Sequence, residues 1–152
     1  MSAAHVRFSY EHRDIDMDVV HGFLRDSYWS PGIRRDVLER AIGRSLVVVA
    51  LADEGGTEKQ IGFTRIVTDG ATFALVCDVF VLEPWRGKGI ATLMLEAAER
   101  HPEITSLRRW LLATRDAHAL YASCGYAPLV EPARWMERRP DPAQWQDREP
   151  GG

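Results

Sequence analysis

The chain has 152 residues, of which 45% are apolar and 27% charged, and both fractions lie near the averages of globular proteins. This length suits a single domain with one core. The net charge is −3, from 19 basic and 22 acidic residues interleaved along the sequence. The longest apolar runs are well short of the roughly twenty residues that a membrane span needs. We therefore expect no nucleic-acid partner and no membrane role.

The two cysteines, Cys77 and Cys124, stand far apart and show no metal-ligand spacing. A chain of this size does not need disulfide bonds to stabilise its core. Met1 is followed by a polar stretch that lacks the charged-then-apolar pattern of a secretion signal. The sequence thus predicts reduced thiols, a cytoplasmic location and no metal site.

The first part of the chain predicts one strand and two helices. Residues 6–10 alternate apolar and polar side chains, as a half-buried strand does. From Asp16, a plausible N-cap, the apolar spacing becomes helical. A second short helix follows, with Gly43 placed just past its end.

The middle of the chain predicts antiparallel strands. The apolar runs at 46–51 and 61–68 are separated by a turn cluster, which indicates a hairpin. Asp69-Gly70 predicts a tight two-residue turn into a strand at 73–82, because glycine tolerates the positive φ of such turns. Pro84 closes this strand and Gly89 opens a helix that ends before Pro102.

Toward the end, the sequence predicts a short strand at 109–112, a short helix at 117–123 stopped by Gly125, and a last strand at 134–138. From Pro140 the chain reads as a loosely held tail. Mostly antiparallel strands followed by a strand–helix unit are typical of the α+β class. We expect one domain over residues 1–139 and a Pro/Gly-rich tail over residues 140–152.

A glycine-rich turn joins the predicted strand at 73–82 to the helix that follows it. The amides at a helix N-terminus are unpaired, and the helix dipole favours an anion such as a pyrophosphate there. Gly87 and Gly89 would let the backbone approach phosphate oxygens, while Arg86 and Lys88 could add charge-assisted contacts. Neither a P-loop nor a Rossmann fingerprint fits, because Gly89 follows Lys88 and Thr92 takes the third glycine position. An ordinary exposed turn remains the alternative.

Arg86, Gly89 and Ala91 fill the pattern Arg-x-x-Gly-x-Ala directly after a strand, and further along the chain Leu120-Tyr121 begins a segment that continues to Gly125-Tyr126. These two motifs resemble, in order, the acetyl-CoA motif and the Leu-Tyr-x-x-x-Gly-Phe segment of the GNAT family of N-acetyltransferases. The resemblance implies a mixed, mostly antiparallel sheet of six to seven strands with helices on both faces. It also implies acetyl-CoA as the acetyl donor, bound by the loop residues Arg86, Gly87, Lys88, Gly89, Ile90 and Ala91.

The resemblance assigns further roles to named residues. Val79, Phe80 and Val81 would pair through their backbone with the pantetheine arm, and an amide of Val79 or Phe80 could bind the thioester oxygen. Tyr121 would be the general acid that protonates the departing thiolate, unless its ring serves packing alone. Asp78 would be the general base, or else an ion-pair partner of Arg65.

Three residues near Tyr121 leave their roles open. Many relatives have Asn where this chain has Asp116, which could contact the donor or cap the following helix. His118 lies three residues before Tyr121 and could relay protons, although a surface histidine is the ordinary interpretation. No His/Asp arrangement supports Cys124 as a nucleophile, so direct transfer is preferred to an acyl-cysteine route.

The acceptor pocket of this family would be formed here by Tyr28, Trp29, Arg65 and Trp135. Tyr28 and Trp29 could instead anchor their loop to the core, and Arg65 could bind an acceptor carboxylate or neutralise Asp78 or Asp69. The leading function is acetyl transfer to a primary amine of a small molecule. A protein lysine or N-terminal acetyltransferase and a non-catalytic acyl-CoA-binding regulator are the alternatives. A homodimer is one of the oligomeric states that the sequence allows.

Overall fold

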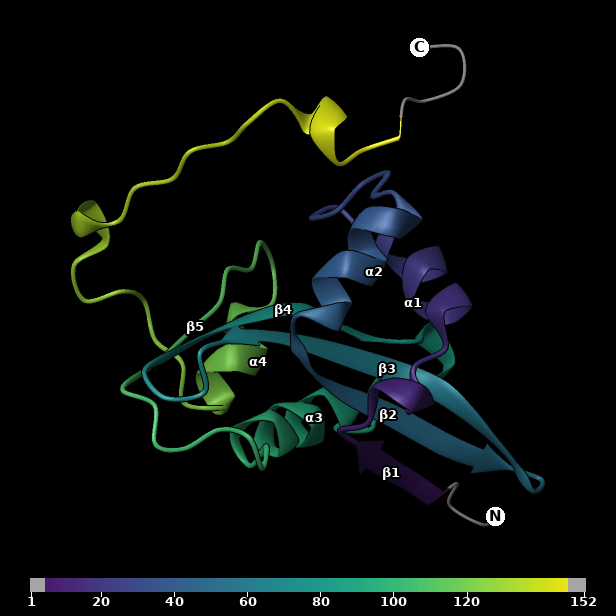
Figure 1. Cartoon of the computed structure of the whole chain (residues 1–152). Coiled ribbons are helices and arrows are strands. Elements are labelled where there is room, and N and C mark those ends of the chain that lie inside the picture. Colours follow the sequence, from purple (N-terminus) through teal and green to yellow (C-terminus); the bar gives the residue numbers. More distant parts are fainter. Residues whose placement is uncertain (1–4, 148–152) are drawn as a thin grey trace.

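The computed structural model describes residues 5–147, in which a five-stranded sheet has helices on both faces (Figure 1). The strand order is β1-β2-β3-β4-β5; neighbours are antiparallel except β4 and β5, which are parallel. The strands are β1 (His5–Ser9), β2 (Leu46–Glu54), β3 (Thr57–Thr68), β4 (Phe73–Val81) and β5 (Arg109–Leu111). The α+β class is confirmed. The expected six to seven strands were too many, because the described part of the chain forms five.

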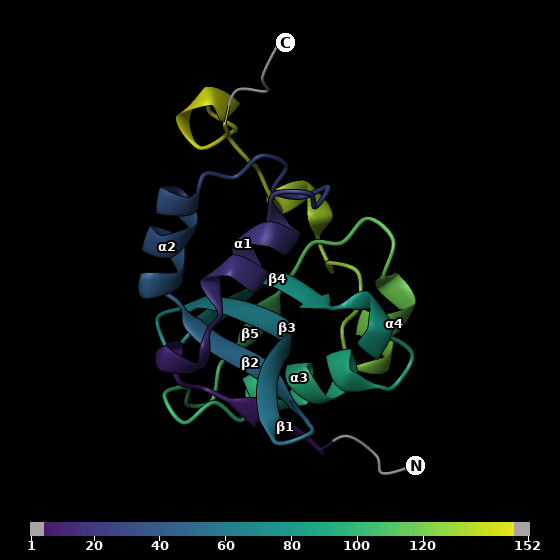
Figure 2. The same ribbon diagram turned by 90° about the vertical axis from the view of Figure 1, so that its right-hand side faces the viewer.

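Two layers of helices sandwich the sheet (Figure 2). α1 and α2 pack on one face and α3 packs on the other, and the short α4 follows β5 in the chain (Figures 1 and 2). The helices are α1 (Met17–Leu24), α2 (Arg35–Gly43), α3 (Ile90–Glu99) and α4 (His118–Ser123). Four short 3-10 turns are found at His12–Asp14, Glu83–Trp85, Pro132–Arg134 and Pro142–Gln144. None of the helices between residues 5 and 147 combines the length and the apolar character needed to cross a bilayer.

Strand β2 supplies both cores because its side chains alternate between the two faces of the sheet. Val47, Val49 and Leu51 pack in the cluster beneath α1 and α2. Val48, Ala50 and Ala52 pack in the cluster beneath α3. A strand buried on both faces reads as a continuous apolar run, which is why residues 46–51 were predicted from sequence.

Local signals placed most helix ends correctly. Asp16 caps α1, and its Oδ1 accepts hydrogen bonds from the amides of Asp18 and Val19. The sequence predicts that α2 ends just before Gly43, whereas in the structure Gly43 is the last residue of this helix.

The predicted two-residue turn at Asp69-Gly70 is wrong. β3 ends at Thr68 and β4 begins at Phe73, so residues 69–72 connect them. The Asp69 carboxylate accepts hydrogen bonds from the amides of Ala71 and Thr72, at 2.9 and 2.8 Å. This side-chain capping replaces the backbone pairing that a tight turn would have required.

After α4 the chain leaves the sheet, and the predicted last strand at 134–138 is also wrong. Residues 127–144 are all exposed, and in Figure 1 they arch away from the body of the domain. The chain then returns to the α1–α2 connection and forms two backbone hydrogen bonds with it. The amide of Arg34 donates to the carbonyl of Trp145 (3.1 Å), and the amide of Asp147 donates to the carbonyl of Gly32 (2.7 Å). The tail predicted from Pro140 is therefore held at 145–147; its remainder, 148–152, lies outside the described residues. The boundary at 139/140 stays a prediction.

Candidate functional site

Strands β4 and β5 pair over only one end of β4. The paired residues of β4 are Phe73, Ala74 and Leu75, which face Arg109, Trp110 and Leu111 of β5. Beyond Leu75, β4 continues to Val81 with β3 on one edge and no strand of the described chain on the other. The backbone groups along this second edge are therefore available to a ligand that mimics a strand.

A β-bulge interrupts β4 next to this open edge. Phe63 faces Phe80 and Arg65 faces Cys77, so that Asp78 and Val79 lie opposite the single residue Thr64. Asp78 has a φ of 54°, and among residues 5–147 it is the one non-glycine residue with a positive φ. A left-handed residue costs roughly 1–2 kcal/mol, and bulges of this kind re-aim the groups that follow them.

The Asp78 side chain is buried in a hydrogen-bonded network. Its Oδ2 accepts from Nε of Arg65 at 2.7 Å, and its Oδ1 accepts from Nε1 of Trp29 at 3.0 Å. Arg65 also donates from Nη1 to Oγ of Ser45 at 3.2 Å. The structure thus brings together three of the predicted site residues, and Arg65 neutralises Asp78, not Asp69.

The α1–α2 loop and the β5–α4 loop contact each other through Tyr28 and Arg115. The amide of Arg115 donates to the Tyr28 hydroxyl at 3.0 Å, and the Arg115 guanidinium lies 3.8 Å from the centre of the Tyr28 ring. Tyr28 contacts Trp29 edge to face, with ring centres 5.0 Å apart. The sequence offered no signal for Arg115, because the contact spans 87 positions.

Tyr121 lies on α4, half-buried, with its ring 6.0 Å from that of Tyr126. Burial raises the pKa of Tyr121 above the ordinary value near 10, and the neighbouring Tyr28 phenol raises it further. The phenol therefore keeps its proton at neutral and mildly alkaline pH. This is the state that a proton donor requires.

The glycine loop joins β4 to α3 and is exposed from Arg86 to Gly89. Gly87 and Gly89 both have a φ of 76°, and a Cβ added to either would meet no atom within 4 Å. Gly89 is the N-cap of α3 and provides no side chain to cap the helix amides. Arg86 donates from Nε to the carbonyl of Val81 at 2.9 Å. No side chain caps the first amides of α3, so these amides are available to a phosphate.

Comparison with known proteins identifies the family. The sequence profile of the Acetyltransferase (GNAT) domain matches residues 43–128, which is more than half of the chain. The chain belongs to the GNAT acetyltransferase family. A candidate GNAT acetyltransferase from Xanthomonas campestris pv. campestris has 38% sequence identity and a structure with a TM-score of 0.81, over 89% of this chain and 93% of that one.

Two further comparisons agree with an acetyltransferase. A candidate acetyltransferase of Deinococcus radiodurans R1 has 20% identity and a TM-score of 0.68 over 88% of this chain and 87% of that one, a likeness of fold. A curated Gibberella zeae protein named as a candidate acetyltransferase is 37% identical over 67 residues, or 41% of this chain. The matched region is 36% of that protein, so the chain matches about a third of its curated relative.

Not every residue predicted for the GNAT site lies with the others. Trp135 lies beside β5, where Arg109 stacks on it at 5.1 Å. The predicted N-cap role of Asp116 is wrong, because Ala117 is the N-cap of α4 and its amide donates to Thr114 Oγ1. His118 is exposed, and Cys124 is a half-buried free thiol. Within residues 5–147 no group of three or more metal-ligating side chains occurs.

Proposed function

We propose that this GNAT acetyltransferase transfers an acetyl group from acetyl-CoA to a primary amine of a small molecule, by direct attack in a ternary complex. One observation carries the proposal. The unpartnered edge of β4 leads directly into a glycine loop at the start of α3, where no side chain caps the helix amides and the space around Gly87 and Gly89 is open. An extended amide chain that ends in a pyrophosphate would satisfy both features.

The donor would be bound mainly by backbone groups. The pantetheine amides would pair with the free edge of β4 at Val79, Phe80 and Val81, as an added strand does. The pyrophosphate would be held by amides between Gly87 and Ala91. Arg86 is already bonded to the carbonyl of Val81, and the Lys88 ammonium lies 5.6 Å from the centre of the Trp85 ring. These two cations would add charge at the rim of the loop, and Asp116 would contact the donor from the loop that precedes α4.

Acetyl-CoA would supply an activated thioester, and the chain would supply polar groups around it. The bulge at Asp78 would turn an amide of Val79 or Phe80 toward the thioester oxygen, where a preorganised donor is most effective. Tyr121 would hold the proton that the departing sulfur receives.

Asp78 would act chiefly by positioning. Each of its oxygens accepts one hydrogen bond, from Arg65 and from Trp29, so it fixes the indole beside the bulge. Its role as general base remains a prediction, which is compatible with this network because each oxygen has a second lone pair. Arg65 is held by Asp78 and Ser45 and would shape the acceptor pocket without binding an acceptor carboxylate.

A small acceptor is favoured over a protein acceptor by the contact between Tyr28 and Arg115. This contact joins the α1–α2 loop to the β5–α4 loop. The joined loops would narrow the entrance to the acceptor pocket. A lysine or N-terminal peptide would need a groove that stays open between these loops. Tyr28 and Trp29 would then contact the acceptor, with Trp135 at a more distant wall.

The experiment mixes the protein with acetyl-CoA and a library of small amines, with lysine and N-terminal peptides as a second set, and measures release of free thiol. We expect thiol release above the hydrolysis background with one or more small amines. Release only with peptides would favour the protein-acceptor alternative. Binding of acetyl-CoA with no amine-dependent release would contradict catalysis and favour the regulator alternative.

A further inference from the structure

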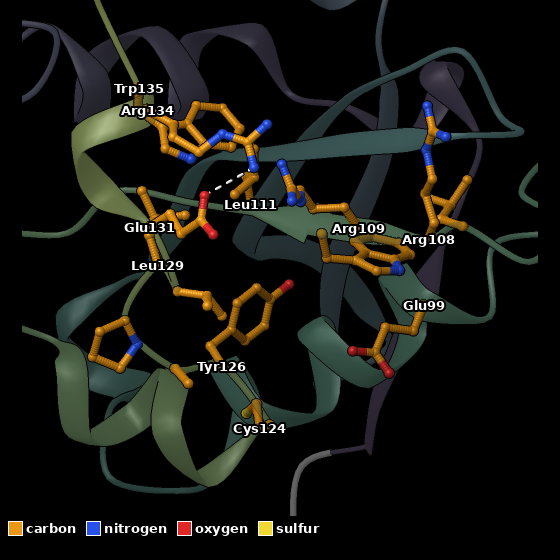
Figure 3. Close-up of a pocket in the computed structure, with 16 residues that line it drawn as sticks. Glu99, Arg108, Arg109, Leu111, Cys124, Tyr126, Leu129, Glu131, Arg134 and Trp135 are labelled. Carbon is orange, nitrogen blue, oxygen red and sulfur yellow. Dashed lines mark hydrogen bonds and ion pairs between the residues drawn. The ribbon is translucent and has the colours of Figure 1, made fainter.

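Two hollows of the surface contain arginine side chains beside aromatic rings. The groove beside β5 measures about 770 Å³, and its lining includes β5 and residues 124–131. Figure 3 shows Arg134 paired with Glu131 in this groove, at 2.9 Å, and Glu99 also lines it. These two carboxylates would compete with an anionic ligand for the arginines of the groove. The second hollow is smaller, and its arginine has no such partner.

We name this second hollow, of about 440 Å³, the Arg115 cavity. It is lined by residues from the end of α1, the loop that follows it and the β5–α4 loop, namely Gly22, Phe23, Asp26, Ser27, Tyr28, Trp29 and Arg115. Two contacts place the cavity over the bulge of β4. The ring of Phe23 stacks on that of Phe80, with centres 4.1 Å apart. The indole of Trp29 is hydrogen-bonded to Asp78.

Arg115 presents its guanidinium to this cavity without a hydrogen-bonded partner. The guanidinium is stacked on the Tyr28 ring at 3.8 Å, and the side chain is 65% exposed. Within residues 5–147 the one carboxylate at ion-pairing distance is that of Asp116, and at 3.8 Å it is too far away for a hydrogen bond. Stacking orients the plane of the guanidinium and leaves its N–H groups available. A carboxylate can bind such a group through two parallel hydrogen bonds.

The other charged side chain that lines the Arg115 cavity is that of Asp26, which is exposed. Its carboxylate attracts an ammonium group and repels a second anion. Together with Arg115 it gives the cavity one positive and one negative charge, which suits a molecule with an amine and a single carboxylate. The rings of Phe23, Tyr28 and Trp29 provide aromatic walls for an apolar portion of that molecule.

We propose that the acceptor is an amine with one carboxylate, such as an amino acid, and that Arg115 binds this carboxylate. The proposal rests on the acetyltransferase function proposed above and names the acceptor class of that site. In the reaction, the acetyl carbon exchanges its bond to sulfur for a bond to the amine nitrogen. The nitrogen loses one proton, and the sulfur leaves as the thiol of CoA. The products are an N-acetylated aminocarboxylate and free CoA.

Matched pairs of amines give the first test. Each pair is an aminocarboxylate and the amine that lacks only its carboxyl group: phenylalanine with phenethylamine, and γ-aminobutyrate with propylamine. We expect kcat/KM to be at least about tenfold higher for the carboxylate member of one pair or both, because only this member can bind the guanidinium through charge-assisted hydrogen bonds. Thiol release with no preference for the carboxylate member of either pair would overturn the proposal and leave the acetyltransferase function intact.

Arg115→Gln tests which residue is responsible. The change removes the guanidinium but keeps the backbone amide that donates to Tyr28, so the contact between the two loops should remain. We expect kcat/KM to fall about tenfold for the aminocarboxylate and to change little for its partner amine, with part of the preference restored by Arg115→Lys. Arg25→Gln is the matched control, because Arg25 is an exposed arginine next to Asp26 that does not line the cavity. An unchanged preference in Arg115→Gln would overturn the assignment.

Binding without turnover separates this proposal from the proposed function. Calorimetry in the presence of CoA measures the dissociation constants of both members of each pair for the unmodified protein and for Arg115→Gln. Binding of an aminocarboxylate that depends on Arg115, without thiol release from acetyl-CoA, would support the carboxylate site and contradict acetyl transfer. If no aminocarboxylate binds more tightly than its partner amine and turnover shows no preference, the carboxylate site is overturned.

Discussion

At the scale of single residues, Asp78 meets three constraints at once. It has the positive φ of the bulge, it is buried, and its two oxygens bind donors from different elements. Asparagine and aspartate tolerate the left-handed conformation better than other residues with a Cβ. A change to asparagine therefore removes the charge with little added backbone strain.

Asp78→Asn should lower the free energy of unfolding by about 3 kcal/mol, because removing one member of a buried ion pair leaves the other charge uncompensated. The Asp78 and Arg65 side chains are 5% and 18% exposed, so solvent screens this pair little. Urea unfolding measures the effect. Asp36→Asn is the control, since Asp36 pairs with Arg34 at 75% exposure and should cost little. Equal costs for the two variants would contradict a strong role for the buried pair.

Tyr121→Phe should lower kcat by about a hundredfold, because a positioned general acid contributes on that order or more. Acetyl-CoA affinity should stay the same, since the phenol is proposed to act on the leaving group. Steady-state kinetics with a reactive amine and calorimetric binding of acetyl-CoA measure the two quantities. Tyr126→Phe is the control, because Tyr126 lies in the groove beside β5. An unchanged kcat would remove the catalytic role of Tyr121.

At the scale of elements, Gly62 sets how closely β3 approaches β4 and α3. A Cβ there would lie 3.0 Å from the carbonyl oxygen of Phe80 and 3.2 Å from Sδ of Met94. Gly62→Ala should therefore destabilise the fold by about 2 kcal/mol through overpacking. Gly22→Ala in α1 is the control; its Cβ would meet no atom, and it should stabilise the protein by about 0.5–1 kcal/mol. Thermal unfolding of both variants compares them, and loss of stability in both would contradict the steric argument.

The glycine loop can be tested against a second glycine of similar conformation. Gly89→Asp adds a carboxylate at the start of α3 and should weaken acetyl-CoA binding at least about tenfold, by repulsion of the pyrophosphate. Gly55 in the β2–β3 turn has a φ of 62° and open space around its Cβ position, so Gly55→Asp imposes comparable backbone strain without touching the loop. Calorimetry measures both dissociation constants. Equal affinities would show that the pyrophosphate lies elsewhere.

The elements that the sequence predicted correctly rest on local signals. The cap at Asp16 and the glycine at the start of α3 act within a few residues, so their consequences are visible in the sequence. The contact of Trp29 with Asp78 spans 49 positions, so the sequence gives no local signal for it. The ion pair between Asp78 and Arg65 likewise becomes visible only when the sheet has folded. The strand predicted at 134–138 failed for a related reason. A strand needs backbone hydrogen bonds to a neighbour, and residues 134–138 pair with no strand of the described chain.

At the scale of the whole molecule, the shifted groups define how stability depends on pH. Burial lowers the pKa of His101, so stability should fall as pH drops below about 6.5, where the unfolded chain takes up a proton that the folded chain resists. Hydrogen bonds from Thr72 lower the pKa of Asp69, and a hydrogen bond from Arg7 lowers that of Glu58. Their contributions are lost at still lower pH. We therefore expect greatest stability between about pH 7 and 9.

The alkaline limit should be set by the Cys77 thiol, whose pKa is raised by burial, and by two tyrosines. Burial raises the pKa of both Tyr121 and Tyr126, and the Glu99 carboxylate raises that of Tyr126 further. Above about pH 10 the unfolded chain loses these protons while the folded chain retains them, so the free energy of unfolding should decrease steadily as pH rises. Tyr126→Phe removes the larger of the two shifts, and urea unfolding between pH 8 and 11, with tyrosinate absorbance as a second signal, should show a shallower decrease. Parallel curves for the variant and the unmodified protein would mean that the Tyr126 phenol ionises as easily in the folded chain as in the unfolded one.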